Sequence, residues 1–238
     1  EETGCQLPET EATALIPAGC WTAPAYLVKA FRTRFYLTWC SGNPQTENGD
    51  GELSDGEWIT PQDALTRWRS NEVLLAPPTR YLIEALAAGA IDDPEIFMAS
   101  DEAHGAPPTH GPVRPHIMMI PLRTPTLPPA THTNCYVIGE SQLLIVEPAS
   151  PYEDDQARLD TYIDKRVAEG ASVEAIFLTH HHPDHIGGVV HLSKRLNVPI
   201  WAHRESAARL PFDVDRFLED GDVITLDDRY HLEVVHTP

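Results

Sequence analysis

Residues 179–188 constrain this chain more than any other part of its sequence. They read Thr-His-His-His-Pro-Asp-His-Ile-Gly-Gly and follow an apolar run, residues 173–178, that is typical of a buried strand. Three imidazoles and one carboxylate thus lie close together in a loop at a strand end: His180, His182, Asp184 and His185. Imidazole nitrogen and carboxylate oxygen are ligands that suit zinc and similar metals. The pattern therefore predicts a metal site on an α/β scaffold.

The local chain geometry divides these side chains between two positions. In an extended segment alternate side chains point the same way, so His180 and His182 can bind one ion. The turn through Pro183 can then direct Asp184 and His185 to a second ion beside it. A histidine-rich loop can also be merely solvated, but ligands at this spacing, between a strand and a Gly-Gly helix start, favour a metal site.

The motif His-x-His-x-Asp-His resembles that of the metallo-β-lactamase superfamily. With histidine directly after aspartate, it is similar to the glyoxalase II and β-lactamase-like endoribonuclease branches. The resemblance extends over residues 115–238. It implies that His180 and His182 bind a first zinc ion, and that Asp184 and His185 bind a second. Asp184 would also help to orient a hydroxide shared by the two ions, which makes it the catalytic candidate.

Two further elements extend this resemblance. Asn134, in Thr-Asn-Cys-Tyr, matches a Thr-Asn-x-Tyr element and is expected to support the metal loop. Thr237-Pro238 matches the first half of a Thr-Pro-Gly-His element, whose histidine would come after the last residue. Neither end of the chain reads as a natural terminus, so we expect truncation at both ends. Because ligands are then missing, we expect weak metal binding and little activity from this chain, and a competent hydrolase in a longer parent protein.

Strands and helices alternate around the motif. Strands are expected at residues 117–122, 134–138, 143–146, 173–178, 198–201, 223–226 and 231–235. A capping box at residues 150–153 predicts one helix start, and Gly170 predicts its end. A second helix is expected between Gly187 and Pro199. This order predicts an α/β fold, and the resemblance implies the first half of a four-layer αβ/βα sandwich over residues 116–238.

A stretch rich in glycine and proline, residues 89–115, is predicted to link two partial domains. The elements expected before it are strands at 34–39 and 57–59, a helix capped by residues 60–63, and a helix over 78–88.

Residues 1–5, Glu-Glu-Thr-Gly-Cys, resemble the end of a Nudix box. The order of the elements that follow is similar to the C-terminal part of a Nudix domain, so the resemblance covers residues 1–88 and implies a partial Nudix-like α/β/α domain. Glu1 and Glu2 match adjacent box glutamates that bind magnesium in that family. The residues that should precede them in the box are absent. The implied magnesium site is therefore vestigial, and we expect no Nudix activity from this chain.

The composition of the chain disfavours several classes of function and location. The 238 residues carry 36 acidic and 17 basic side chains, a formal net charge of −19. Such a surface repels phosphate backbones and gives no support to nonspecific RNA binding. Apolar runs are too short to span a bilayer, and no secretory signal is visible. The four cysteines form no C-x-x-C pair, so reduced thiols in the cytoplasm are expected over disulfides.

The leading hypothesis is a cytoplasmic fragment of a dinuclear zinc hydrolase that cleaves a thioester, lactone or phosphodiester. The acidic surface favours a small-molecule ester, while the endoribonuclease resemblance leaves RNA open. An iron-dependent persulfide dioxygenase on the same fold is a second hypothesis, because these ligands also accept iron. A non-catalytic binding module, in which both domains have decayed, is a third. Antibiotic hydrolysis is disfavoured, because such enzymes are usually exported.

Overall fold

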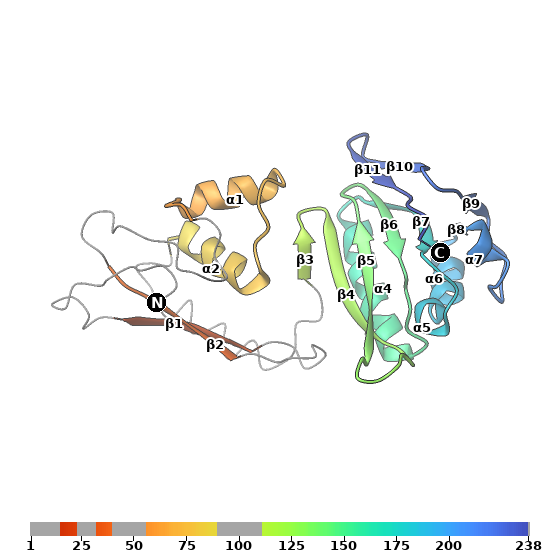
Figure 1. Ribbon diagram of the computed structural model, residues 1–238, viewed down its shortest axis with the longest axis horizontal. Coiled ribbons are helices and arrows are strands. Elements are labelled where there is room, and N and C mark those ends of the chain that lie inside the picture. The colour runs from red at the N-terminus through yellow and green to blue at the C-terminus, as the bar shows by residue number, and fades with distance from the viewer. Residues whose placement is uncertain (1–14, 23–31, 40–55, 90–110, 238) are drawn as a thin grey trace. The chain divides into compact units, whose positions relative to one another are not determined.

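The computed structural model describes residues 15–22, 32–39, 56–89 and 111–237 (Figure 1). The chain divides into two compact units. The first comprises Glu1–Ala25 and Lys29–Pro107, and the second comprises Tyr26–Val28 and Pro108–Pro238. No helix in the described ranges is long and apolar enough to cross a membrane.

The first unit contains two helices whose starts and ends follow the sequence signals. α1 (Pro61–Arg69) begins at Thr60, whose hydroxyl accepts a hydrogen bond from a backbone amide in the first turn, as predicted. α2 (Pro77–Ala87) is followed by Gly89 at φ +89°, also as predicted. The prediction of a strand at residues 57–59 was wrong, because no strand in the described part of this unit pairs with them.

A strand pair packs on α2 through a small core. β1 (Ile16–Thr22) and β2 (Arg32–Leu37) are antiparallel. Ala18 of β1 is buried against Phe35 of β2 and Leu82 of α2. Because the box glutamates at positions 1 and 2 lie outside the described residues, the Nudix resemblance stays a prediction.

The second unit is built on a seven-stranded sheet (Figure 1). Its strands lie in chain order: β3 (Gly111–Arg114), β4 (Ile117–Arg123), β5 (His132–Ile138), β6 (Gln142–Val146), β7 (Ser172–Leu178), β8 (Ile200–His203) and β9 (Arg216–Leu218). Pairs from β3 to β6 are antiparallel, and pairs from β6 to β9 are parallel. This mixed sheet confirms the predicted α/β class. The sheet begins inside the stretch predicted as a linker, since β3 pairs with β4.

Two helices cover one face of this sheet. α4 (Glu153–Ala168) and α6 (Val189–Leu196) bury apolar side chains against it, among them Leu159, Ile163 and Leu192. These residues recur at helical spacing, which is why sequence periodicity finds both helices.

A β-hairpin packs on the opposite face. It consists of β10 (Val223–Leu226) and β11 (Tyr230–Glu233). Its Ile224 packs with Leu144 of β6 and Ala175 of β7. Alternate residues of β6 and β7 therefore face the helices and the hairpin, and both strands are apolar on both sides.

The turn between β5 and β6 is held by Asp227, which lies in the hairpin turn. Its carboxylate accepts hydrogen bonds from the backbone nitrogens of Glu140, Ser141 and Gln142 at 2.7, 3.0 and 2.9 Å. Burial opposes the ionised form, but these bonds outweigh it and lower the pKa of Asp227 to about 2. Gly139 supplies the φ of +111° that this predicted turn needs.

The capping box predicted at residues 150–153 was wrong. The residue that precedes α4 is Tyr152, and no side chain caps the helix there. The Ser150 hydroxyl instead accepts from the Tyr152 amide at 3.2 Å, and its carbonyl accepts from Gln156 at 3.0 Å. Ser150 therefore stabilises the turn before α4 and does not cap the first turn of the helix.

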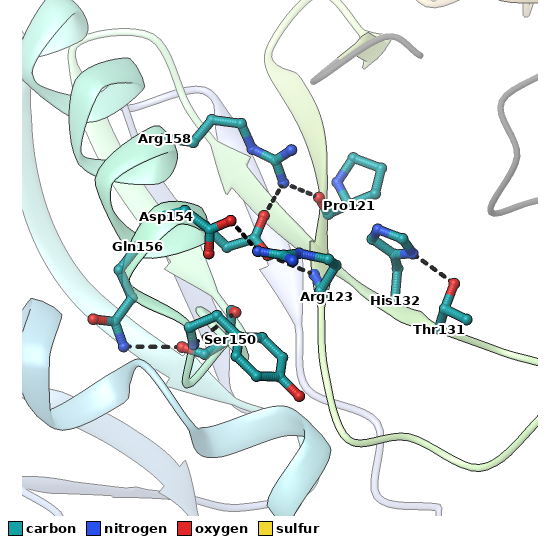
Figure 2. Close-up of polar contacts among 10 residues, drawn as sticks. Pro121, Arg123, Thr131, His132, Ser150, Asp154, Gln156 and Arg158 are labelled. Atoms are coloured by element: carbon teal, nitrogen blue, oxygen red, sulfur yellow. Dashed lines mark hydrogen bonds and ion pairs between the residues drawn. The ribbon is translucent and has the colours of Figure 1, made fainter. Parts of the chain in front are cut away.

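Ion pairs tie the first turn of α4 to the end of β4 (Figure 2). Asp155 is 3% exposed and accepts from Arg123 Nε at 2.8 Å. Its other oxygen lies 2.7 Å from Arg158, which also donates to the Pro121 carbonyl. Arg123 in turn reaches Asp154. A buried carboxylate with two paired guanidinium groups thus joins the first turn of α4 to β4.

Candidate metal centre

The predicted metal loop follows β7 at the carboxyl end of the parallel strands. It passes through the single turn α5 (Pro183–Ile186) into α6. The amides of Gly187 and Gly188 donate to the carbonyls of Ala149 and Pro148 at 3.0 and 2.9 Å. A Cβ atom on Gly188 would lie 2.6 Å from the Pro148 oxygen, so a side chain cannot fit there without a shift. The Gly-Gly pair therefore docks the metal loop on the loop that follows β6.

The structure brings the four predicted ligands together. The ring centroids of His180 and His185 lie 4.0 Å apart, and those of His180 and His182 lie 4.8 Å apart. Asp184 lies beside them, with a carboxylate oxygen 3.7 Å from His185 Nε2. Imidazole and carboxylate groups are donors that suit zinc. Within the described part of the chain, however, His182 and Asp184 do not belong to the group whose ligand atoms all lie within 4.8 Å of one another, which contains His180 and His185.

A further residue, Glu147, supports the cluster and was missed by sequence reasoning. It directly follows β6, is 7% exposed, and has a φ of +54°, which is uncommon outside glycine. Its carboxylate accepts from His185 Nδ1 at 2.9 Å and from the hydroxyl of Thr179. One signal was present: side chains that follow adjacent parallel strands converge at one sheet edge, and Glu147 follows the strand beside β7.

These hydrogen bonds set the proton positions on two histidines. An ionised carboxylate only accepts, so His185 Nδ1 carries a proton, and in the neutral ring its Nε2 keeps a lone pair. Thr179 gives its single hydroxyl proton to Glu147, so it accepts from His180 Nδ1, 2.9 Å away. Both rings therefore offer an unprotonated Nε2 to a metal.

Glu147 itself could be considered a ligand, because Glu147, His180 and His185 offer ligand atoms within 4.8 Å of one another. However, its two oxygens already accept from Thr179 and from His185. We therefore assign Glu147 to orienting the ligands, which is the usual task of a carboxylate behind metal-binding histidines.

The pKa values of this cluster shift in opposite directions. Burial raises the pKa of Glu147, but hydrogen bonds from His185 and Thr179 outweigh it and lower the pKa overall. Burial lowers the pKa of His185, but the hydrogen bond and charge of Glu147 overcome it and raise the pKa. Burial and the nearby charge of His185 lower the pKa of His180. A proton therefore competes with a metal more strongly at His185 than at His180.

The loop between β4 and β5 supports Asp184. Burial raises the pKa of Asp184, but a hydrogen bond from Thr126 and the charge of His185 contribute to lowering it overall. The base of this loop is closed by the buried hydroxyls of Thr124 and Thr133, which lie 2.9 Å apart. Asp184 is thus kept in the ionised form that binds metals.

His180 and His182 line a cavity of about 760 Å³, whereas Asp184 and His185 are not part of its lining. Other lining residues come from the turn α7 (Arg204–Ala207) and from the segment after β11, and they include Arg209 and the stacked rings of His203 and His236, 4.2 Å apart. His181 also lines the cavity, although strand alternation would direct it away from the other histidines.

The remaining predicted site residues lie apart from this cluster or outside the described residues. Asn134 is exposed on β5 and does not line the cavity, so its supporting role stays a prediction. Thr237 lines the cavity, and the role that its sequence match implies stays a prediction. Glu1 and Glu2 lie outside the described residues.

Comparison with known proteins identifies the family of the part of the chain that contains this loop. Residues 128–235 match the family model described as Metallo-beta-lactamase superfamily. This part of the chain is a metallo-beta-lactamase superfamily domain. Two curated relatives are named Hydroxyacylglutathione hydrolase. The one from Bdellovibrio bacteriovorus is 40% identical over 63 residues, 26% of this chain and 25% of that protein. The one from Aeromonas salmonicida is 33% identical over 120 residues, 48% of this chain and 41% of that protein.

The chain therefore spans less than half the length of either relative. Two solved structures show a weaker likeness to the metallo-beta-lactamase domain. BJP-1, a subclass B3 metallo-beta-lactamase of Bradyrhizobium japonicum, has 21% identity and a TM-score of 0.44, over 56% of this chain and 53% of that one. ETHE1 from Myxococcus xanthus has 20% identity and a TM-score of 0.31, over 39% and 38%.

Proposed function

We propose that the metallo-beta-lactamase domain serves a dinuclear zinc hydrolase that cleaves a thioester. The main support is that Glu147 and Thr179 accept the Nδ1 protons of His185 and His180, which leaves both Nε2 atoms free. Relatives named Hydroxyacylglutathione hydrolase favour a thioester such as hydroxyacylglutathione. The net charge of −19 disfavours RNA as the substrate.

Each residue of the cluster has a separate task in this proposal. His180 and His182 would hold one zinc ion, and Asp184 and His185 would hold the other. When bound, zinc supplies Lewis acidity and lowers the pKa of a coordinated water to about 7. Glu147 fixes the imidazole orientations before any metal binds, so little reorganisation is required.

Metal binding tests the site independently of activity. Wild type, His182→Ala and His185→Ala are titrated with Co²⁺, and the visible absorption of the bound ion is followed. We expect each variant to lose about tenfold or more in affinity. The control is His191→Ala, whose ring pairs with Asp160 at 3.0 Å outside the cluster, and it should bind as wild type does. Equal affinities in all four proteins would refute the site.

Thioester cleavage tests the reaction. The zinc-loaded chain, and the longer protein if the gene continues past Pro238, are incubated with hydroxyacylglutathione and separately with an RNA oligonucleotide. We expect zinc-dependent thioester cleavage that requires His185, and intact RNA. Cleavage of RNA alone would overturn the thioester assignment. Native iron with persulfide oxidation would establish the dioxygenase alternative, and metal binding with no reaction would favour a binding module.

The N-terminal unit adds no activity to this proposal. Its Nudix-like character, the magnesium site at Glu1 and Glu2, and a cytoplasmic location for the chain all stay predictions.

A further inference from the structure

Among the residues that the structure describes, Arg209 differs from most arginines of the second unit in having no acidic or aromatic partner. Within residues 111–237, ion pairs join acidic side chains to Arg123, Arg158, Arg166, Arg195, Arg204 and Arg229. Arg216 lies over the ring of Trp201 at 4.7 Å. Among the described residues, no carboxylate or ring contacts the Arg209 guanidinium. In a chain with 36 acidic and 17 basic residues, a free guanidinium is unexpected.

The backbone of Arg209 is nevertheless fixed. Its amide donates to the carbonyl of Ser206 at 3.0 Å, and the next amide, that of Leu210, donates to Ala207 at 3.2 Å. The Leu210 side chain packs against the main core of the unit. The turn after α7 therefore holds the base of the Arg209 side chain in place, and only the side chain is free to move.

The guanidinium lies in the wall of the metal cavity. Arg209 lines this cavity together with His180, His181 and His182. Two acidic residues, Glu205 and Glu233, line the same cavity. Glu205 lies 3.9 Å from Nε2 of His236, and neither acid pairs with Arg209. Among the described residues, Arg209 is thus an arginine without an acidic partner in a cavity that the predicted ligands His180 and His182 also line.

We infer that Arg209 binds an anionic group of the substrate, a carboxylate or a phosphate, while the scissile bond lies at the metal loop. A guanidinium presents parallel N–H donors that match the two oxygens of such a group. The cavity is also lined by Val146 and Phe177, which provide an apolar surface for the rest of the molecule. This inference rests on the proposed function and narrows its substrates to anionic thioesters.

A binding experiment tests Arg209 without requiring catalysis. The probes are (benzylthio)acetate and its methyl ester, which differ in one negative charge and contain no thioester. Binding to the ¹⁵N-labelled chain is followed by NMR chemical shifts. We expect wild type to prefer the acid by about fivefold, as for an exposed ion pair. Arg209→Gln should lose this preference without changing its affinity for the ester, and Arg209→Lys should keep part of it.

The matched control is Arg204→Gln, which removes the same charge from a neighbouring position paired with Glu219 at 2.8 Å. This variant should keep the preference for the acid. If wild type binds acid and ester equally, or if both glutamine variants lose the preference to the same extent, the assignment of Arg209 is wrong.

A kinetic experiment separates this inference from the proposed function. The benzoyl thioesters of mercaptoacetate and of its methyl ester are assayed with wild type and Arg209→Gln. We expect the variant to raise KM about fivefold for the anionic thioester alone, with kcat unchanged. Cleavage of both thioesters with no effect of charge would overturn the role of Arg209. No cleavage by any protein, together with an Arg209-dependent preference in binding, would overturn the thioesterase function and leave the anion site.

Discussion

Glu147 and Asp227 hold the two ends of β6 with similar means. Each is a carboxylate on a left-handed backbone, with φ of +54° and +55°. Asp227 accepts from the amide of Gln142, the first residue of the strand, while Glu147 directly follows Val146, the last. Hydrogen bonds lower the pKa of both carboxyls against the effect of burial.

The difference lies in the donors. Asp227 accepts from three consecutive backbone amides and from the Ser141 hydroxyl, so it fixes the path of the chain. Glu147 accepts from His185 and Thr179, and the His185 imidazole retains a second nitrogen, Nε2, that is not used in this contact. A carboxylate that binds amides stabilises a turn, whereas one that binds imidazoles prepares metal ligands. The following substitutions test this distinction.

Glu147→Gln should have the largest effect on metal binding. The amide keeps the shape of the side chain but removes the charge that fixes the proton on His185 Nδ1. We expect zinc affinity to fall by about 10- to 100-fold, as for other groups behind metal ligands. Calorimetric zinc titration measures this effect. Asp227→Asn is the matched control and should bind zinc as wild type does. If both variants lost zinc affinity equally, Glu147 would have no role in metal binding that Asp227 lacks.

Gly188→Ala should reduce stability by disturbing the contact that places the metal loop beside Glu147. The new Cβ atom would lie 2.6 Å from the Pro148 oxygen. We expect a cost of about 1–3 kcal/mol, which is typical of overpacking. Hydrogen exchange of β6 and β7 amides measures it within this unit. Gly111→Ala is the control, since no atom lies within 4 Å of its added Cβ. If both variants lost similar stability, the close contact between Gly188 and Pro148 would not explain the effect of Gly188→Ala.

The part of the fold that sequence predicts well depends on local signals. The strand at residues 143–146, the helix face containing Leu159 and Ile163, and the turn at Gly139 all follow from periodicity and backbone preference. The helix start at Thr60 also follows a local rule. The proximity of His180, His182 and His185 could be predicted because these residues lie close together in the sequence.

The contacts that sequence reasoning missed join distant positions. Asp155 and Arg123, which form an ion pair, are 32 residues apart. Glu147 lies 38 residues before His185. No local sequence pattern around Asp155 or Glu147 identifies its partner, because the partner depends on which strands become neighbours in the sheet.

Asp227→Asn should reduce stability modestly and in a pH-dependent way. The carboxyl has a pKa of about 2 in the folded chain and 3.8 ordinarily, so its contribution is full above pH 3.8 and is lost as the pH falls through 2. We expect a loss of about 1 kcal/mol at pH 7, because the group is partly exposed and solvent screens it. Urea unfolding and exchange of the amides of residues 140–142, compared at pH 7 and near pH 2, measure it.

The control is the neighbouring exposed Asp228, which shares the left-handed backbone, with φ of +55°. Asp228→Asn should match wild type at both pH values. An unchanged difference between Asp227→Asn and wild type at low pH would mean that the charge of Asp227 is not what holds the turn.

Thr126→Val should have the smallest effect, because Thr126 donates one hydrogen bond to a ligand that remains ionised without it. We expect about a threefold loss of zinc affinity at neutral pH, the usual contribution of a single hydrogen bond. In the metal-free chain, the Asp184 pKa measured by NMR should move upward, toward its ordinary value. Thr126→Ser keeps the donor and should restore both properties. A loss as large as that of Glu147→Gln would show that support of Asp184 is as important as orientation of the histidines.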